Sequence, residues 1–231
     1  MVTDKEVRTF LAKHRHAAAG VLGVLAAGML AVPPIIVSMG PGAWNTWLSW
    51  VPRLTALYAF TFIFMNIVTG ALAPDFYAIF KARGEYLIHL VTGALGFLLA
   101  LTHGLIILTQ RTYRVYSAAW LLGPVALVLL VFTIWVALDR SRLKKVWRVI
   151  HQVNYAIFVA IYVKAVLIGT DFKLNDASSK ALMAIFSAYV AIAAVALLLR
   201  VRRYQVLAAG RRKREAAKAL AAEADDSASA E

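Results

Sequence analysis

The sequence predicts an all-α membrane protein, a bundle of six transmembrane helices with both termini in the cytoplasm. The chain has 231 residues and is 61% hydrophobic, with a mean hydropathy of +0.71. Several apolar runs reach about twenty residues, the length that crosses the hydrocarbon core of a bilayer. Cysteine is absent, which excludes disulfides and thiolate-bound metal or iron–sulfur centres. Any redox chemistry therefore needs a bound cofactor, and histidines become the candidate ligands.

Six apolar segments are long enough to span a membrane. They cover residues 17–39, 53–73, 86–109, 118–138, 148–169 and 180–200. The first segment follows a basic stretch and resembles a signal peptide in that respect. Its length, its Pro33–Pro34 pair and the lack of a small-residue cleavage site favour a retained helix instead.

The distribution of lysine and arginine predicts the orientation of the six spans. The N-terminal arm, the loops after the second and fourth spans, and the C-terminal tail hold 19 of them, whereas the opposite loops hold 5. By the positive-inside rule, both termini are cytoplasmic. This topology also accounts for the formal net charge of +13, so no nucleic-acid partner is expected.

The chain divides into a basic cytoplasmic arm (1–16), a transmembrane domain (17–200) and a cytoplasmic tail (201–231). The tail begins basic and becomes rich in Ala and Glu, which predicts a short surface helix that frays into disorder. It is too short for a flavin or nicotinamide domain, and no glycine-rich dinucleotide fingerprint occurs in the sequence. An electron donor would therefore be a separate molecule.

The third and fifth spans carry the candidate ligands. His89 and His103 are fourteen residues apart, close to four helical turns, so they share one face at about 21 Å separation along the axis. His151 lies near the cytoplasmic end of the fifth span, at the depth of His89. One intramembrane histidine can merely hydrogen-bond a neighbouring helix. Three of them, on two helices and at matched depth, favour axial ligation of a b-type haem.

This pattern resembles the ferric-reductase-like transmembrane domain, a six-helix cytochrome b core, over residues 50–200. The stretch LKKVWRVIHQVNY and the lack of a dehydrogenase domain are most similar to the haem-binding membrane subunit of the bacterial methionine-sulfoxide reductase system. The resemblance implies two stacked haems, held by two histidines on the third helix and two on the fifth. His89 and His103 match the first pair, and His151 matches the first position of the second.

Lys164 stands thirteen residues after His151, where that family has its fourth histidine. A lysine amine can ligate haem iron only in its neutral form; alternatively, Lys164 snorkels to the outer interface. Three outcomes stay open: an outer haem held by His103 and Lys164, one held by His103 with another or no sixth ligand, or no outer haem. The inner haem, between His89 and His151, does not depend on this choice.

Two further residues have supporting interpretations. Arg148 lies at the cytoplasmic end of the fifth span, where it can pair with a haem propionate or face lipid headgroups. Tyr155 lies one turn beyond His151 and can border the porphyrin or simply pack against other helices.

The sequence thus predicts an electron-transfer protein that binds haem b in the bacterial inner membrane. Quinol or a separate flavoprotein reductase would supply the electron, and a periplasmic oxidoreductase, ferric iron or oxygen would accept it. Two alternatives are a single-haem quinol or superoxide oxidase, and a haem-free transporter or proton or cation relay built on the intramembrane His and Lys residues. The lack of an internal repeat and of acidic residues inside the predicted spans argues against the relay.

Overall fold

The structure is a computed structural model that describes residues 4–39, 46–109, 118–144, 146–173 and 176–229. Within these ranges the chain forms helices and no strand. It divides into two units: residues 1–193, called here the bundle unit, and residues 194–231, called the tail unit. The bundle unit contains every candidate site residue.

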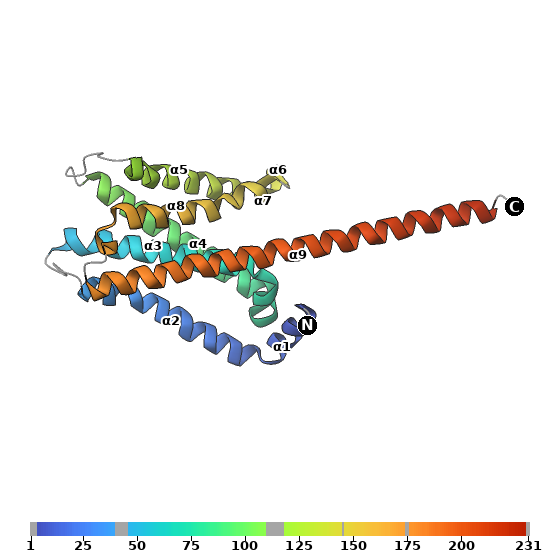
Figure 1. The fold of residues 1–231 in the computed structure, drawn as a ribbon, viewed down its shortest axis with the longest axis horizontal. Coiled ribbons are helices and arrows are strands. Elements are labelled where there is room, and N and C mark those ends of the chain that lie inside the picture. The colour runs from blue at the N-terminus through green and yellow to red at the C-terminus, as the bar shows by residue number, and fades with distance from the viewer. Residues whose placement is uncertain (1–3, 40–45, 110–117, 145, 174–175, 230–231) are drawn as a thin grey trace. The chain divides into compact units, whose positions relative to one another are not determined.

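Nine α-helices and one 3-10 helix occur in the described ranges (Figure 1). They are α1 (Asp4–Lys13), α2 (Arg15–Met39), α3 (Trp47–Ala71), α4 (Ala73–Thr109), α5 (Ala118–Leu138), α6 (Arg140–Leu143), α7 (Val146–His151), α8 (Val153–Ile168), η1 (Thr170–Phe172) and α9 (Ala177–Ser229). Six helical stretches are long and apolar enough to cross a membrane: α2, α3, α4, α5, α7 with α8, and α9. The predicted all-α membrane fold with six spans is therefore confirmed.

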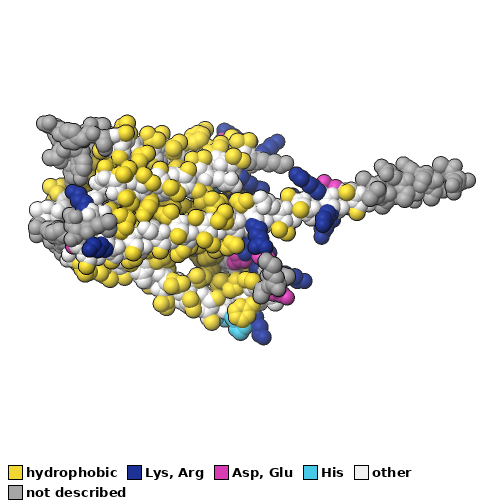
Figure 2. Space-filling view, in the orientation of Figure 1, with side chains coloured by type: hydrophobic (Ala, Val, Ile, Leu, Met, Phe, Trp, Pro, Cys, Tyr) yellow, Lys and Arg dark blue, Asp and Glu magenta, His cyan; other side chains and the backbone are white. Residues whose placement is uncertain are grey.

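The apolar surface of the helices fits a lipid environment. Many large hydrophobic side chains are exposed, among them Val128, Leu138 and Leu167, and they cover much of the visible face of the bundle unit (Figure 2). Helices can present such faces to lipid because their backbone groups are hydrogen-bonded within the segment.

Both described ends of the chain are helical, and the C-terminal one differs from the sequence expectation. The arm contains the helix α1, which packs against α4, and Arg8 Nε lies 3.7 Å from a carboxylate oxygen of Asp75. In the tail unit, residues 194–229 continue α9 without a break, so the prediction of a short, fraying surface helix is wrong in the described range. The reason is composition: residues 201–229 lack proline and are rich in Ala and Arg, which are strong helix formers.

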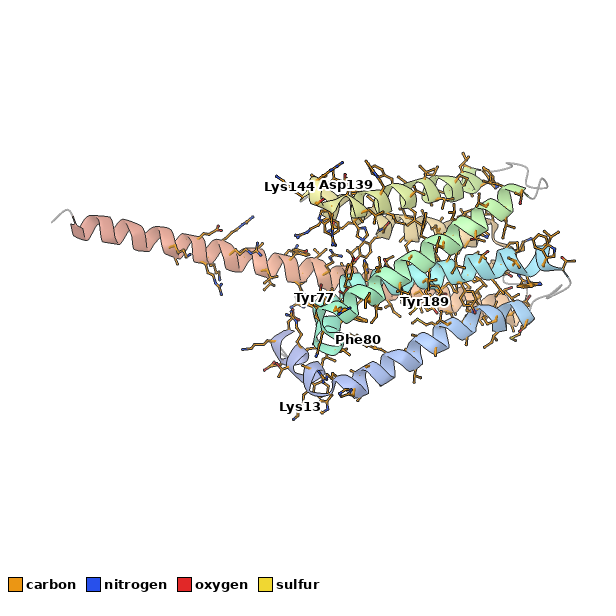
Figure 3. All side chains as sticks on the ribbon, turned by 180° about the vertical axis from the view of Figure 1, so that it is seen from behind. Lys13, Tyr77, Phe80, Asp139, Lys144 and Tyr189 are labelled. Carbon is orange, nitrogen blue, oxygen red and sulfur yellow. The ribbon has the colours of Figure 1, made fainter. Side chains whose placement is uncertain are left out.

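The helix α4 is interrupted on the side that was predicted to be cytoplasmic. Lys81 has φ 60° and ψ 167°, a non-helical conformation that breaks the helix into two parts. Tyr77 and Phe80 lie in the shorter first part (Figure 3). The second part matches the predicted third span and carries both of its histidines.

Four helices of the bundle unit pack in a closed order. α3 packs on α4, α4 on α5, α5 on α8, and α8 on α3. Helices α4 and α8 therefore stand on one diagonal of this four-helix arrangement. The centre of such a bundle is where side chains from facing helices can build a cofactor or metal site.

Aromatic rings fill the side of the bundle formed by α3, α8 and the first part of α9. Phe60 stacks on Phe158 with ring centres 4.3 Å apart and on Phe186 at 4.7 Å. Phe64 stacks on Tyr189 at 4.3 Å, and Tyr189 is labelled in Figure 3. All five side chains are buried, and stacked aromatic pairs add stability beyond the area they bury. This core makes α3 a fixed support for the helices around it.

An ion pair closes the end of the bundle that was predicted to be outer. Arg53 of α3 donates through Nε to Asp171 of η1 at 2.8 Å, and its Nη2 lies 2.5 Å from the same oxygen. Both side chains are largely buried, with exposed fractions of 17% and 16%.

We expect Arg53→Met to lower the free energy of unfolding by about 2 kcal/mol, because it leaves a poorly solvated carboxylate without its partner. Thermal unfolding in detergent measures this, and the double variant with Asp171→Leu should regain much of the loss. Equal stability of Arg53→Met and the unmodified chain would contradict this role.

Candidate functional site

The inner pair, His89 on α4 and His151 on α7, meets across the diagonal of the bundle. Among the described residues, no Cα of α4 lies within 8 Å of a Cα of α7 or α8. The two imidazole rings nevertheless have centres only 6.1 Å apart, with an angle of 67° between their planes. The helices stand apart while their histidine rings approach each other, as predicted from matched depth.

His89 is held in place by α3. Its ring Nδ1 lies 3.1 Å from the backbone carbonyl oxygen of Asn66 and 3.4 Å from the hydroxyl of Thr69. The Asn66 side chain donates in turn to the backbone carbonyl of His89. When Nδ1–H donates to the carbonyl of Asn66, the neutral ring carries its lone pair on Nε2, the tautomer that suits metal ligation.

Gly70 makes the close approach of α3 and the His89 ring possible. A Cβ atom at position 70 would lie 2.9 Å from Cε1 and 3.3 Å from Nδ1 of His89. Contacts this short do not occur without displacement of one partner, so the ring rests directly on the α3 backbone. Gly93 plays the reciprocal part on α4, since a Cβ there would lie 2.8 Å from Nδ2 of Asn66.

His151 is supported by a polar pair between α5 and α8. Its Nδ1 lies 3.4 Å from the Asn154 amide nitrogen, while Thr133 Oγ1 is 2.8 Å from Asn154 Oδ1 and 3.0 Å from the Leu130 carbonyl. The Thr133 hydroxyl has a single proton, so it can donate to only one of these two acceptors, Asn154 Oδ1 or the Leu130 carbonyl. With the amide turned by 180°, its nitrogen donates to Thr133 and its oxygen accepts from His151 Nδ1. In that orientation Thr133 donates to the Leu130 carbonyl, and His151 Nδ1–H donates to Asn154, which leaves the lone pair of His151 on Nε2.

The other predicted pair, called here the outer pair, consists of His103 on α4, four turns from His89, and Lys164 on α8. His103 Nδ1 lies 2.9 Å from the backbone carbonyl oxygen of Pro52 on α3. Lys164 lies against α5, where a Cβ at Gly123 would be 2.9 Å from its Cε and 3.1 Å from its Nζ. Lys164 is thus packed against a neighbouring helix and only half exposed.

The other two predicted site residues lie beside the inner pair. The Arg148 guanidinium is exposed and stands 5.9 Å from the centre of the Trp147 ring. The Trp147 ring is in turn 5.9 Å from that of His151. Tyr155 is half-buried and packs against the hydrophobic core. Their predicted contacts with a haem stay predictions.

Several residues of the site were not identified from the sequence. Asn66, Thr69 and Gly70 form the support of His89, and Asn154 with Thr133 forms that of His151. A signal existed in part, because an asparagine inside an apolar span needs a polar partner. Glu85 was also missed: it lies one residue before the predicted third span, yet it is buried within α4 and hydrogen-bonds Tyr77.

The chemistry open to these residues is that of paired nitrogen ligands. No group of three or more His, Asp or Glu side chains that could hold a metal ion occurs in the described part of the chain. The inner pair instead offers two imidazoles, enough for the two axial positions of a haem iron. Comparisons with protein-family models, curated proteins and solved structures give no match to this chain. The fold and site define a six-span helical membrane protein with a histidine pair at its bundle diagonal.

Proposed function

We propose that the chain is a haem b-binding electron-transfer protein, with His89 and His151 as the axial ligands of an inner haem. The observation that carries the proposal is the meeting of these two imidazoles, whose ring centres are 6.1 Å apart, across helices whose Cα atoms, where described, stand more than 8 Å apart. A metal–nitrogen bond of about 2.0 Å, plus roughly 1.1 Å from nitrogen to ring centre, puts two axial imidazole centres about 6.2 Å apart. The separation of 6.1 Å fits this value.

The angle between the rings is compatible with the same assignment. Each ring can turn about the axis through its ligating nitrogen without moving that nitrogen, so an angle of 67° between the planes still permits a shared axis. The backbone carbonyl of Asn66 and the amide of Asn154 hold the two Nδ1 atoms. These contacts fix the orientation of the ligands and increase the electron donation of each imidazole.

A bound haem would supply a one-electron redox centre that the side chains of this cysteine-free chain lack. The protein's own part is to hold two neutral imidazoles and to exclude water with the apolar residues of α3, α4 and α8. We propose that Arg148 pairs with a propionate at the predicted cytoplasmic end and that Tyr155 borders the porphyrin. These roles fit their positions next to His151.

The direction of transfer follows from the predicted topology. Quinol or a separate flavoprotein reductase would donate to the inner pair from the cytoplasmic side. The electron would leave toward the outer pair and reach a periplasmic oxidoreductase, ferric iron or oxygen. This proposal places the chain in a bacterial inner membrane and assigns bond-making catalysis to a partner.

The decisive test counts haem in the purified protein. We expect one haem b per chain, measured by the pyridine haemochrome spectrum and normalised to protein by amino-acid analysis. Lys164→Ala should keep that haem, because the inner pair does not use position 164. Two haems per chain that fall to one in Lys164→Ala would instead assign an outer haem to His103 and Lys164.

The absence of haem would overturn the proposal and favour the alternative function, a haem-free proton or cation relay. One observation supports that alternative: Glu85 is a buried acid within α4, one turn from His89. A chain that binds no haem, and whose Glu85→Gln variant loses proton transport in liposomes, would be a relay.

A further inference from the structure

The connection between α5 and α7 carries a dense positive charge at the predicted cytoplasmic end. Five of the nine residues 140–148 are Lys or Arg, and Asp139 is the only acidic residue of the sequence within 118–168. Asp139 and Lys144 are labelled in Figure 3. Three exposed cations of this connection are called here the basic corner: Arg140, Arg142 and Lys144.

The acid beside the basic corner leaves most of this charge available to a partner. Asp139 lies 3.6 Å from Arg142, whose side chain is 85% exposed. An exposed ion pair of this kind is weak, because water and salt screen it. An anionic surface that approaches the corner can therefore compete with Asp139 for Arg142.

The basic corner lies next to two aromatic rings that flank the inner pair. Tyr86 precedes His89 by about one turn of α4, and Trp147 precedes His151 by about one turn of α7. The Arg140 guanidinium stands 6.0 Å from the centre of the Tyr86 ring, at the limit of a cation–π contact. The Trp147 ring centre is 5.9 Å from that of His151. The corner thus begins about one helical turn beyond the two histidines.

This position favours one of the two donor classes considered for the inner pair. Electron transfer slows steeply with distance, so a donor must come close to its acceptor. A quinol is uncharged and would approach through the apolar interior of the membrane, where the basic corner gives it no advantage. A soluble protein with an acidic face gains directly, because complementary charge steers its approach and fixes its orientation.

We propose that the basic corner is the docking surface for the acidic face of a soluble electron-donor protein in the cytoplasm. This inference rests on the proposed function and names the donor for the inner pair. In the complex the donor is oxidised by one electron and the proposed inner haem is reduced by one electron. No covalent bond forms or breaks. Arg148 stays with the propionate and is not part of the docking surface.

Anionic lipid headgroups are the competing occupants of the same cations. The positive-inside rule accounts for basic residues in every cytoplasmic loop, and headgroups would be attracted to all of them alike. The short distance from the corner to the inner pair is the feature that favours a redox partner. The test therefore includes an arm for lipid.

The first measurement does not depend on haem. Because the chain has no cysteine, Ser141→Cys can carry a single fluorescent label at an exposed position of α6. The full chain is placed in phosphatidylcholine nanodiscs and titrated with poly-L-glutamate as an acidic polypeptide probe. We expect a saturable change in fluorescence that weakens as salt rises. Poly-L-lysine should cause no change.

Two triple variants of the labelled chain locate the binding. The test variant reverses the charges of the basic corner: Arg140→Glu, Arg142→Glu and Lys144→Glu. The matched control reverses three exposed charges of α1 and the start of α2: Lys5→Glu, Lys13→Glu and Arg15→Glu. Both variants change the net charge equally. The test variant should weaken the binding of poly-L-glutamate at least about tenfold and the control by less than about threefold. Equal losses would overturn the proposal, because net charge alone would then explain the binding.

The second measurement follows haem reduction in the loaded chain by stopped-flow absorbance. Dithionite serves as an anionic reductant and reduced methyl viologen as a cationic one. The test variant should slow reduction by dithionite at least about tenfold, since electrostatic steering changes association rates on this scale. It should not slow reduction by methyl viologen, which verifies that the variant is folded and loaded. Equal dithionite rates in the two triple variants would overturn the docking surface.

The remaining outcomes separate this inference from the proposed function and from lipid binding. A chain without haem would refute electron transfer in the haem assay, whereas a loaded chain with equal dithionite rates would refute the docking surface alone. The lipid arm replaces phosphatidylcholine with phosphatidylglycerol. A label that responds to this replacement in the unmodified basic corner but not in the test variant, and that ignores poly-L-glutamate, would assign the corner to headgroups and overturn the proposal.

Discussion

His151→Ala is expected to reduce the haem content of the purified protein at least about tenfold, because it removes one of the two proposed axial ligands, His89 and His151. His89→Ala should have the same effect from the opposite helix. The fold should survive both changes, since neither ring belongs to the aromatic core around Phe60. The measurement is haem per chain from the pyridine haemochrome spectrum, with circular dichroism to verify helix content.

His16→Ala is the matched control for these two variants. His16 lies at the start of α2 and is exposed, so its removal should leave haem content unchanged. His103→Ala tests whether the haem proposed at the inner pair depends on the outer histidine. We expect this variant to keep the inner haem. Full haem content in both His89→Ala and His151→Ala would refute the inner site.

Gly70→Ala is expected to reduce haem occupancy nearly as strongly, although position 70 offers no ligand. The added methyl group would lie 2.9 Å from Cε1 of His89, so the ring must move away from Asn66 and out of line with His151. Loss of ligand orientation typically costs about 10- to 100-fold in metal affinity. We expect a corresponding fall in haem content, or a shift of the remaining haem from the low-spin to the high-spin absorption spectrum.

Gly23→Ala in α2 provides the control, since a Cβ there meets nothing within 4 Å. Both substitutions favour the helical state by up to about 1 kcal/mol. A loss of haem in Gly70→Ala therefore cannot result from a weaker helix. Equal haem content in the two glycine variants would show that His89 does not depend on its contact with α3.

The sequence was sufficient for the spans and for the histidine pair. Hydropathy and charge locate helices because a membrane restricts the chain to long apolar segments. His89 and His151 lie at the same predicted depth on two parallel spans, so the two side chains can meet. The structure adds that these helices stand on a diagonal of the bundle, which no periodicity of a single helix can reveal.

The supports of the histidines could not be predicted for a related reason. Gly70 matters only because α3 presents it to His89, and Gly123 only because α5 presents it to Lys164. Such contacts depend on the rotation of one helix against another, and an apolar span encodes that rotation weakly. The long α9 was missed because polarity was interpreted as disorder, although the same residues are strong helix formers.

The diagonal position of the inner pair has a consequence for the biogenesis of the protein. One half of the pair is on α4 and the other on α7, with α5 and α6 between them in the chain. During synthesis His89 enters the membrane first. His151 follows only after α5 and α6 have been synthesised. The proposed haem could therefore be bound by both histidines only in a nearly complete bundle, so that bound haem would indicate correct insertion of the fifth span.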